Sequence, residues 1–162
     1  KNYKGEQYAS CHGETWPLYR ESLSTGPGIA AFCEVAGDTM AVSRCYMGME
    51  YVMTAQLNFD VARITPLCES MPKNRMGQCF GSAASRSIET DYRLAPKAVE
   101  LCEVAQKHGV GERCYKEILF YSSFNYHQDS KEFVELCSAL PEPWNQKCLT
   151  GEGKHIMPTD ES

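Results

Sequence analysis

Cysteine is the residue type in this sequence with the most chemical potential. Nine cysteines occur among 162 residues, a density typical of disulfide-bonded proteins from oxidising compartments. Metal binding is the alternative, but zinc and iron–sulfur sites favour cysteines roughly two to four residues apart, and no such spacing occurs. We therefore interpret the cysteines as disulfide partners and expect no metal or other cofactor. They are Cys11, Cys33, Cys45, Cys68, Cys79, Cys102, Cys114, Cys137 and Cys148.

The histidines form no recognisable catalytic or metal-binding pattern. None of His12, His108, His127 and His155 has a second histidine at helical metal spacing, and we interpret them as loop residues. A cysteine–histidine nucleophile needs a free thiol. Only Cys11 qualifies, and neighbouring residues on a helix point about 100° apart, so His12 is badly placed to activate it. We expect no catalytic residues, and an enzyme is the least favoured reading.

The cysteines recur with a constant period. The first members of four pairs lie at positions 33, 68, 102 and 137, in steps of 35, 34 and 35. The second members at 45, 79, 114 and 148 follow in steps of 34, 35 and 34. A fixed period of this size is typical of an array of two-helix repeats.

Apolar residues around each first cysteine predict a helix that packs on a core. Apolar residues lie four and one positions before it in every unit, and a further one lies three positions after it. These offsets share one helical face. The residues four positions before the first cysteines are Ile29, Ile64, Ala98 and Phe133. Those one position before are Phe32, Leu67, Leu101 and Leu136, and those three positions after are Ala36, Met71, Ala105 and Leu140.

Breaker-rich stretches separate two helices in each unit. Glycine and proline between paired cysteines predict a turn, and we expect the second cysteine to open the second helix. Asp60 and Ser130 are predicted N-caps, and Pro96 a first-turn residue. Pro66 predicts a kinked or short helix. The small residues 81–84 would let a neighbouring helix approach closely.

The pairing that repeats in every unit is local, and each bridge then joins the two helices at their shared turn. Sequence alone does not prove connectivity. The competing arrangement places each pair within one helix that bridges to a second, as in coiled-coil-helix proteins, and the glycines and prolines in these stretches disfavour it. The predicted bridges are Cys33–Cys45, Cys68–Cys79, Cys102–Cys114 and Cys137–Cys148.

Cys11 has no partner in this scheme. In the repeat frame it is the second member of a unit whose first member precedes Lys1. Either its partner lies upstream, in a longer array, or Cys11 is a free thiol or forms an intermolecular bridge. Residues 1–150 are predicted to form a single repeat domain, and residues 151–162 a polar C-terminal tail.

The two-helix period over nearly the whole chain resembles tetratricopeptide-like α/α repeats, and the cysteine pair in each unit is similar to their secreted, disulfide-stapled subgroup. The tryptophan-containing tetratricopeptide signature is absent. The resemblance implies an all-α, right-handed solenoid of about four hairpins that presents a concave surface to a partner protein or peptide.

Net charge and hydropathy disfavour nucleic acid as a partner and a segment that crosses a membrane. A net charge of −5 makes nucleic acid an improbable partner, because phosphate binding needs a basic surface. No apolar run reaches the roughly 18 residues of a transmembrane helix, and no signal peptide is visible at Lys1. We expect a secreted, periplasmic or extracellular protein, in preference to one of the mitochondrial intermembrane space.

Aromatic residues supply the candidate binding positions. Trp16 and Tyr19 form one candidate pair, and Tyr121 and Tyr126 another, whereas Phe120 and Phe124 are expected to pack between units. The function expected is a non-catalytic scaffold or accessory subunit of a larger envelope or extracellular assembly. The alternative is a self-assembling structural protein.

Overall fold

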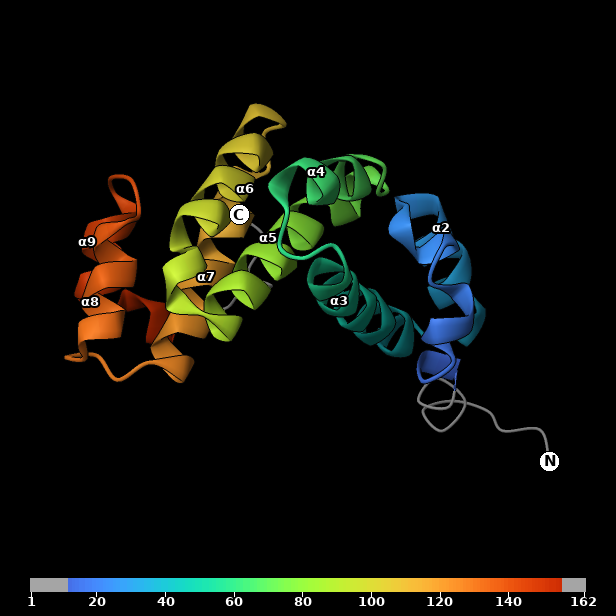
Figure 1. The fold of residues 1–162 in the computed structure, drawn as a ribbon, viewed down its shortest axis with the longest axis horizontal. Coiled ribbons are helices and arrows are strands. Elements are labelled where there is room, and N and C mark those ends of the chain that lie inside the picture. The colour runs from blue at the N-terminus through green and yellow to red at the C-terminus, as the bar shows by residue number, and fades with distance from the viewer. Residues whose placement is uncertain (1–11, 156–162) are drawn as a thin grey trace.

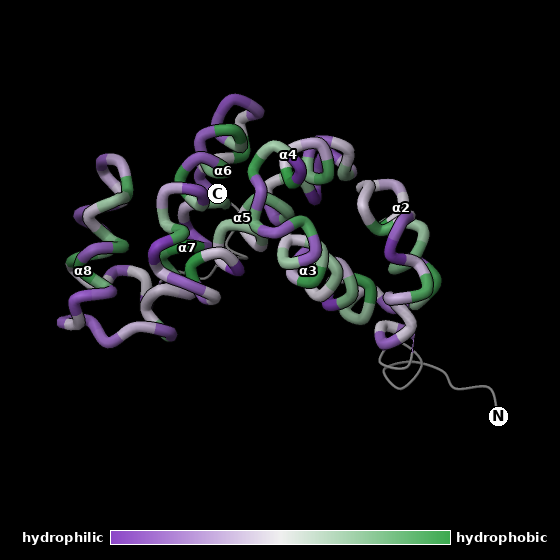
Figure 2. The backbone as a smooth tube through the Cα atoms, viewed as in Figure 1, coloured by the Kyte–Doolittle hydropathy of each residue, from purple (hydrophilic) through white to green (hydrophobic). Residues whose placement is uncertain are grey.

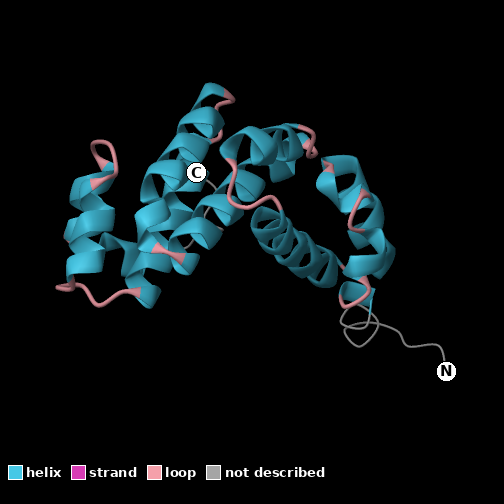
Figure 3. Cartoon of the chain, in the orientation of Figure 1, coloured by secondary structure: helices cyan, strands magenta, loops and turns pink. Residues whose placement is uncertain are grey.

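The structure, a computed structural model, describes residues 12–155 and is built from helices. No strand occurs in this range (Figure 3), so the all-α prediction is confirmed. Within residues 12–155, eight α-helices pair in sequence order as hairpins: α2 with α3, α4 with α5, α6 with α7, and α8 with α9. Their bounds are Gly26–Cys33 (α2), Thr39–Gln56 (α3), Val61–Glu69 (α4), Lys73–Thr90 (α5), Ala95–Lys107 (α6), Gly111–Asn125 (α7), Lys131–Ser138 (α8) and Trp144–Leu149 (α9).

Short 3-10 helices complete the secondary structure of the described range. They are η1 (Trp16–Tyr19), η2 (Ser22–Ser24), η3 (Glu34–Ala36), η4 (Tyr92–Leu94) and η5 (Glu152–His155). The hairpins are arranged as an arch, with α2 and α3 at one end and α8 and α9 at the other (Figure 1). None of the described helices is both long and apolar enough to cross a bilayer.

Four local disulfides join the two helices of each hairpin, as the sequence predicted. Their Cα–Cα distances of 5.3 to 5.5 Å are usual for disulfides. The expectation that the second cysteine opens a helix is wrong, because α3 begins six residues before Cys45 and α5 six before Cys79. Each bridge therefore joins the last turns of one helix to the first or second turn of the next. The bridges are Cys33–Cys45, Cys68–Cys79, Cys102–Cys114 and Cys137–Cys148.

The predicted helical faces form the core. All four first cysteines are buried, together with the apolar residues four and one positions before each of them. Of the residues three positions after each first cysteine, Ala36 is only half-buried, whereas Met71, Ala105 and Leu140 are buried. In Figure 2 hydrophobic and hydrophilic residues both occur along the helices, which is the pattern of amphipathic helices packed on one side.

Helix starts follow the predicted capping residues. The Asp60 carboxylate accepts a hydrogen bond from the Ala62 amide, and the Ser130 hydroxyl accepts one from the Phe133 amide. Pro96 lies in the first turn of α6, where its missing N–H costs no hydrogen bond. Pro66 lies inside α4, which is only nine residues long.

Helix α5 is the central helix and is buried on most of its surface. It contacts α3, α4, α6 and α7. Small residues make this possible, as the sequence predicted: a Cβ added to Gly81 would lie 2.6 Å from Cγ of Glu117 on α7. Its buried residues are Gly77, Gln78, Cys79, Phe80, Gly81, Ser82, Ala83, Ala84, Ser85, Ser87 and Ile88.

One aromatic side chain differs from expectation. Phe124, predicted to pack between units, is 68% exposed, because it lies at the end of α7 on a side that no described helix covers. Phe120 is half-buried. Met49 and Met53, four residues apart on α3, are both buried, whereas Met47 is exposed.

The last described turn packs back on the third hairpin. Helix η5 contacts α7 and α9, and Gly153 is buried against α7. A Cβ at Gly153 would lie 2.2 Å from the Leu119 carbonyl oxygen, so only glycine permits this contact. Within the described range, η5 is thus part of the folded body.

Candidate functional site

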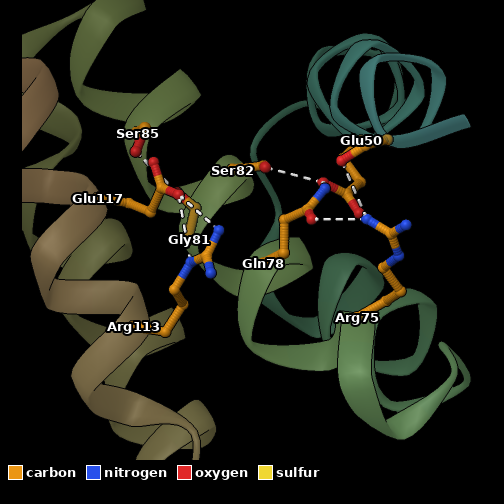
Figure 4. A network of polar contacts seen from close by, with 9 residues as sticks. Glu50, Arg75, Gln78, Gly81, Ser82, Ser85, Arg113 and Glu117 are labelled. Carbon is orange, nitrogen blue, oxygen red and sulfur yellow. Dashed lines mark hydrogen bonds and ion pairs between the residues drawn. The ribbon is translucent and has the colours of Figure 1, made fainter. Parts of the chain in front are cut away.

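A buried polar network joins three helices in the middle of the arch. Helices α3 and α7 both pack on α5, and each presents a glutamate to it (Figure 4). Glu50 on α3 is 0% exposed and Glu117 on α7 is 5% exposed. Ionisable side chains are rarely buried to this degree unless they are paired, so these two carboxyls are the most unusual groups in the described structure.

Glu50 is held by neutral donors. Its Oε2 accepts hydrogen bonds from Ser82 Oγ at 2.8 Å and from Gln78 Nε2 at 3.3 Å. Its Oε1 is buried and has no hydrogen-bond partner among the described residues. Arg75 lies nearby, but its Nη1 donates to Ser43 Oγ and Gln78 Oε1, and its guanidinium group lies over the Tyr46 ring. No described cation forms an ion pair with Glu50.

Glu117 has a closer charged partner. Its Oε1 lies 3.5 Å from both Nη2 and Nε of Arg113, one turn earlier on α7. Its stem packs on Gly81 of α5. Next to this contact, the Ser85 hydroxyl donates to the Gly81 carbonyl oxygen. The two glutamates therefore lie on either side of α5, one with a neutral environment and one with a cation.

Burial controls the protonation of both groups. Desolvation raises the pKa of Glu50 to about 8, although the hydrogen bonds from Ser82 and Gln78 and the charge of Arg75 oppose this shift. Desolvation also raises the pKa of Glu117, and Arg113 opposes it. At neutral pH, Glu50 is therefore mostly a neutral carboxylic acid.

An aromatic cluster lies on the same helices. We use this name for Tyr51, Phe120, Tyr121 and Phe124. The ring centroids of Tyr51 on α3 and Tyr121 on α7 are 6.1 Å apart, and Phe120 lies 5.3 Å from Tyr121 and 4.8 Å from Phe124. Arg86 of α5 lies over the Tyr51 ring at 5.6 Å, a cation–π contact.

Of the predicted binding residues, Trp16 and Tyr19 lie together at one end of the arch. Trp16 is half-buried against the core, and Tyr19 is 47% exposed. The Tyr19 ring contacts Phe32 edge-on at 5.3 Å. The His12 ring stacks on the Phe32 ring, with the ring centroids 4.1 Å apart. His12 Nε2 also donates a hydrogen bond to the Phe32 carbonyl oxygen. The rings of His12 and Tyr19 therefore both pack on Phe32 of α2.

Tyr121 lies on α7 and Tyr126 is the C-cap residue of the same helix, but the two side chains have different surroundings. Tyr121 belongs to the aromatic cluster. The Tyr126 hydroxyl donates to the Ile88 carbonyl oxygen near the end of α5, and its ring meets Tyr92 edge-on. Tyr126 thus contacts the second hairpin, whereas Tyr121 contacts Phe120, which in turn packs on the exposed Phe124.

Possible metal ligands do not cluster in the described range. Residues 12–155 contain no group of three or more histidine, cysteine, aspartate or glutamate side chains placed to hold a metal ion. His108 lies in the turn between α6 and α7 and pairs with Glu69 at 2.9 Å. Cys11, the predicted odd cysteine, lies outside the described residues.

Sequence reasoning missed both glutamates. One signal was present: Tyr46, Glu50 and Thr54 lie at i, i+4 and i+8, next to the buried Met49 and Met53 stripe. All five side chains are buried. A glutamate inside such a set is a candidate for burial against the small residues of α5.

Comparison with known proteins found no matching family model, no similar curated protein and no similar solved structure.

Proposed function

We propose that this chain is a non-catalytic scaffold that binds another protein, built as a right-handed solenoid of tetratricopeptide-like hairpins and exported to an oxidising compartment. The near-constant 34-residue period supports the repeat architecture. Four disulfides within the described range support an oxidising location, because thiols stay reduced in the cytosol.

The exposed end of the aromatic cluster is the observation that carries the binding role. Phe124 exposes 68% of its surface while its ring contacts Phe120. Large aromatic side chains that are rigid and exposed are typical anchors of protein interfaces. Because Tyr51 and Tyr121 come from the first and third hairpins, the cluster offers a partner a surface shaped by the arch as a whole.

Site-specific photo-crosslinking tests this proposal. A photoreactive phenylalanine analogue replaces Phe124 in the full chain, and the matched control carries it at Val134, which is 44% exposed on α8. In extract from the source, we expect a discrete adduct with one other protein from position 124 and none from position 134. Equal labelling from both positions, or no adduct at all, would contradict the proposed surface.

The same experiment separates the alternative function. Adducts between two copies of this chain, together with large species in size-exclusion chromatography with light scattering, would indicate a self-assembling protein. Adducts with a different protein and a monomeric chain in solution support the scaffold.

A further inference from the structure

Glu50 lies at the contact that joins the first hairpin to the rest of the arch. This hairpin, α2 and α3, meets the second hairpin mainly where α3 packs on α5. Its other contacts are smaller: α2 touches α4, and the Gly26 amide at the start of α2 donates to Ser70 Oγ after α4. The state of the α3–α5 contact therefore governs how firmly the first hairpin is held.

The surroundings of Glu50 disfavour an ionised carboxylate. Two neutral donors, Ser82 and Gln78, bind Oε2, and Oε1 has no acceptor or donor among the described residues. Once ionised, the buried carboxylate has only these two neutral hydrogen bonds and no ion pair. Burial of a charge without a paired cation is strongly unfavourable.

The ionisable groups around Glu50 come from several elements. On α5, Arg75 favours the ionised form, whereas Glu117 on α7 disfavours it. On α3 itself, Tyr46 lies within electrostatic reach, and its hydroxyl donates to Glu34 of η3. The sequences of α2 and η2 contain no ionisable side chain other than Cys33, which is in a disulfide. Desolvation of Glu50 has a larger effect on its pKa than any of these charges.

We propose that the α3–α5 contact is a proton-dependent latch, closed while Glu50 is protonated and released when Glu50 loses its proton to solvent at alkaline pH. Release moves α3, with α2, away from α5. The carboxylate then gains water, which relieves the cost of its burial. The argument for the latch does not rest on the proposed binding role.

The latch has a consequence for the aromatic cluster. Tyr51 is the next residue after Glu50 on α3, and its ring faces Tyr121 of α7 and Arg86 of α5. Opening of the latch separates Tyr51 from Tyr121 and removes the cation–π contact. Proton release at Glu50 thus changes the surface that the first and third hairpins form together.

Hydrogen–deuterium exchange by mass spectrometry tests the latch on the full chain. Amide protection in α3 is compared at about pH 6 and about pH 9.5 after correction for the intrinsic rate. In the wild type we expect protection of α3 to fall at least about tenfold beyond that correction, whereas α6 and α8 stay protected. Glu50→Gln keeps α3 protected at both pH values. The matched control, Glu103→Gln on the exposed side of α6, behaves as the wild type.

Two results would overturn the proposal: equal protection of α3 at both pH values in the wild type, or an unchanged loss in Glu50→Gln. Should that variant fold poorly, Ser82→Ala keeps the carboxyl and removes a donor to Oε2. Because this donor favours the ionised form, its loss shifts the midpoint of release to higher pH. A midpoint that is unchanged or lower in Ser82→Ala would equally contradict the latch.

Discussion

Gly81 of α5 and Glu117 of α7 are in such close contact that no side chain fits between them. An ideal Cβ at Gly81 would lie 2.6 Å from Cγ and 3.1 Å from Cβ of Glu117. Both atoms belong to the inner part of a buried side chain, which cannot swing away into solvent. The approach of α5 and α7 therefore depends on the absence of a side chain at position 81.

Gly81→Ala is predicted to destabilise the protein. The added methyl group forces α7 or Glu117 to move, and overpacking of this kind costs about 1–3 kcal/mol. Urea denaturation measures the change in the free energy of unfolding. Gly48→Ala on α3 is the matched control, because nothing lies within 4 Å of its added Cβ, and the better helix propensity of alanine stabilises by up to about 1 kcal/mol. Equal effects at the two positions would contradict the close contact.

Loss of a single disulfide is predicted to weaken the whole arch. The double variant Cys68→Ala/Cys79→Ala opens the bridge of the second hairpin, which has a sequence separation of 11. The chain-entropy model gives a loss of about 3 kcal/mol for a loop of this size. Thermal unfolding followed by circular dichroism measures it, and Ser138→Ala on the exposed side of α8 is the control.

The bridge assignment itself has a direct check. A non-reducing peptide map of the full chain should contain the four local bridges and no bridge between hairpins. A linkage between hairpins would contradict the bridge assignment. It would also contradict the predicted stability loss, because the closed loop would be longer and its loss of chain entropy different.

Tyr126→Phe is predicted to loosen the contact between the second and third hairpins. It removes the hydroxyl that donates to the Ile88 carbonyl oxygen, and a lost hydrogen bond of this kind costs about 1 kcal/mol. The ring contact with Tyr92 remains. Val134→Ala, at an exposed position of α8, gives a baseline near zero in the same denaturation series. A Tyr126→Phe variant as stable as the wild type would show that the hydroxyl contributes nothing.

The cysteine period predicted much of this architecture because local chemistry determines it. Apolar residues at fixed helical offsets, the capping groups of Asp60 and Ser130, and bridges of constant spacing are all properties of neighbouring residues. The second helix of a hairpin begins earlier than predicted. The turns after Cys33 and Cys68 end well before the second cysteines, so Cys45 and Cys79 lie inside α3 and α5.

The polar network could not be predicted in the same way. Glu50 becomes buried only because α5, with its small side chains, packs along α3, and this contact joins residues 32 positions apart. A glutamate is usually solvated, so its own sequence context gives the opposite expectation. Phe124 shows the reverse case, since an aromatic residue on a helix is usually buried and here no described element covers it.

Glu50→Gln is predicted to raise stability increasingly with pH. Folding raises the pKa of Glu50 from 4.5 to about 8, so the folded state holds this proton more tightly than the unfolded chain. Its stabilising contribution is complete below pH 4.5 and is lost as the pH rises to about 8, at a slope of up to about 1.4 kcal/mol per pH unit. Glutamine stays neutral in both states, so the variant lacks this slope.

The difference between the two proteins isolates this one group. Guanidinium denaturation at a series of pH values gives the free energy of unfolding of wild type and variant. We expect the two curves to converge at acidic pH and to diverge from there up to about pH 8, because groups that do not interact with Glu50 contribute equally to both. Parallel curves would mean that Glu50 is ionised in the folded protein at neutral pH, and that its burial is compensated by a charge rather than by a proton.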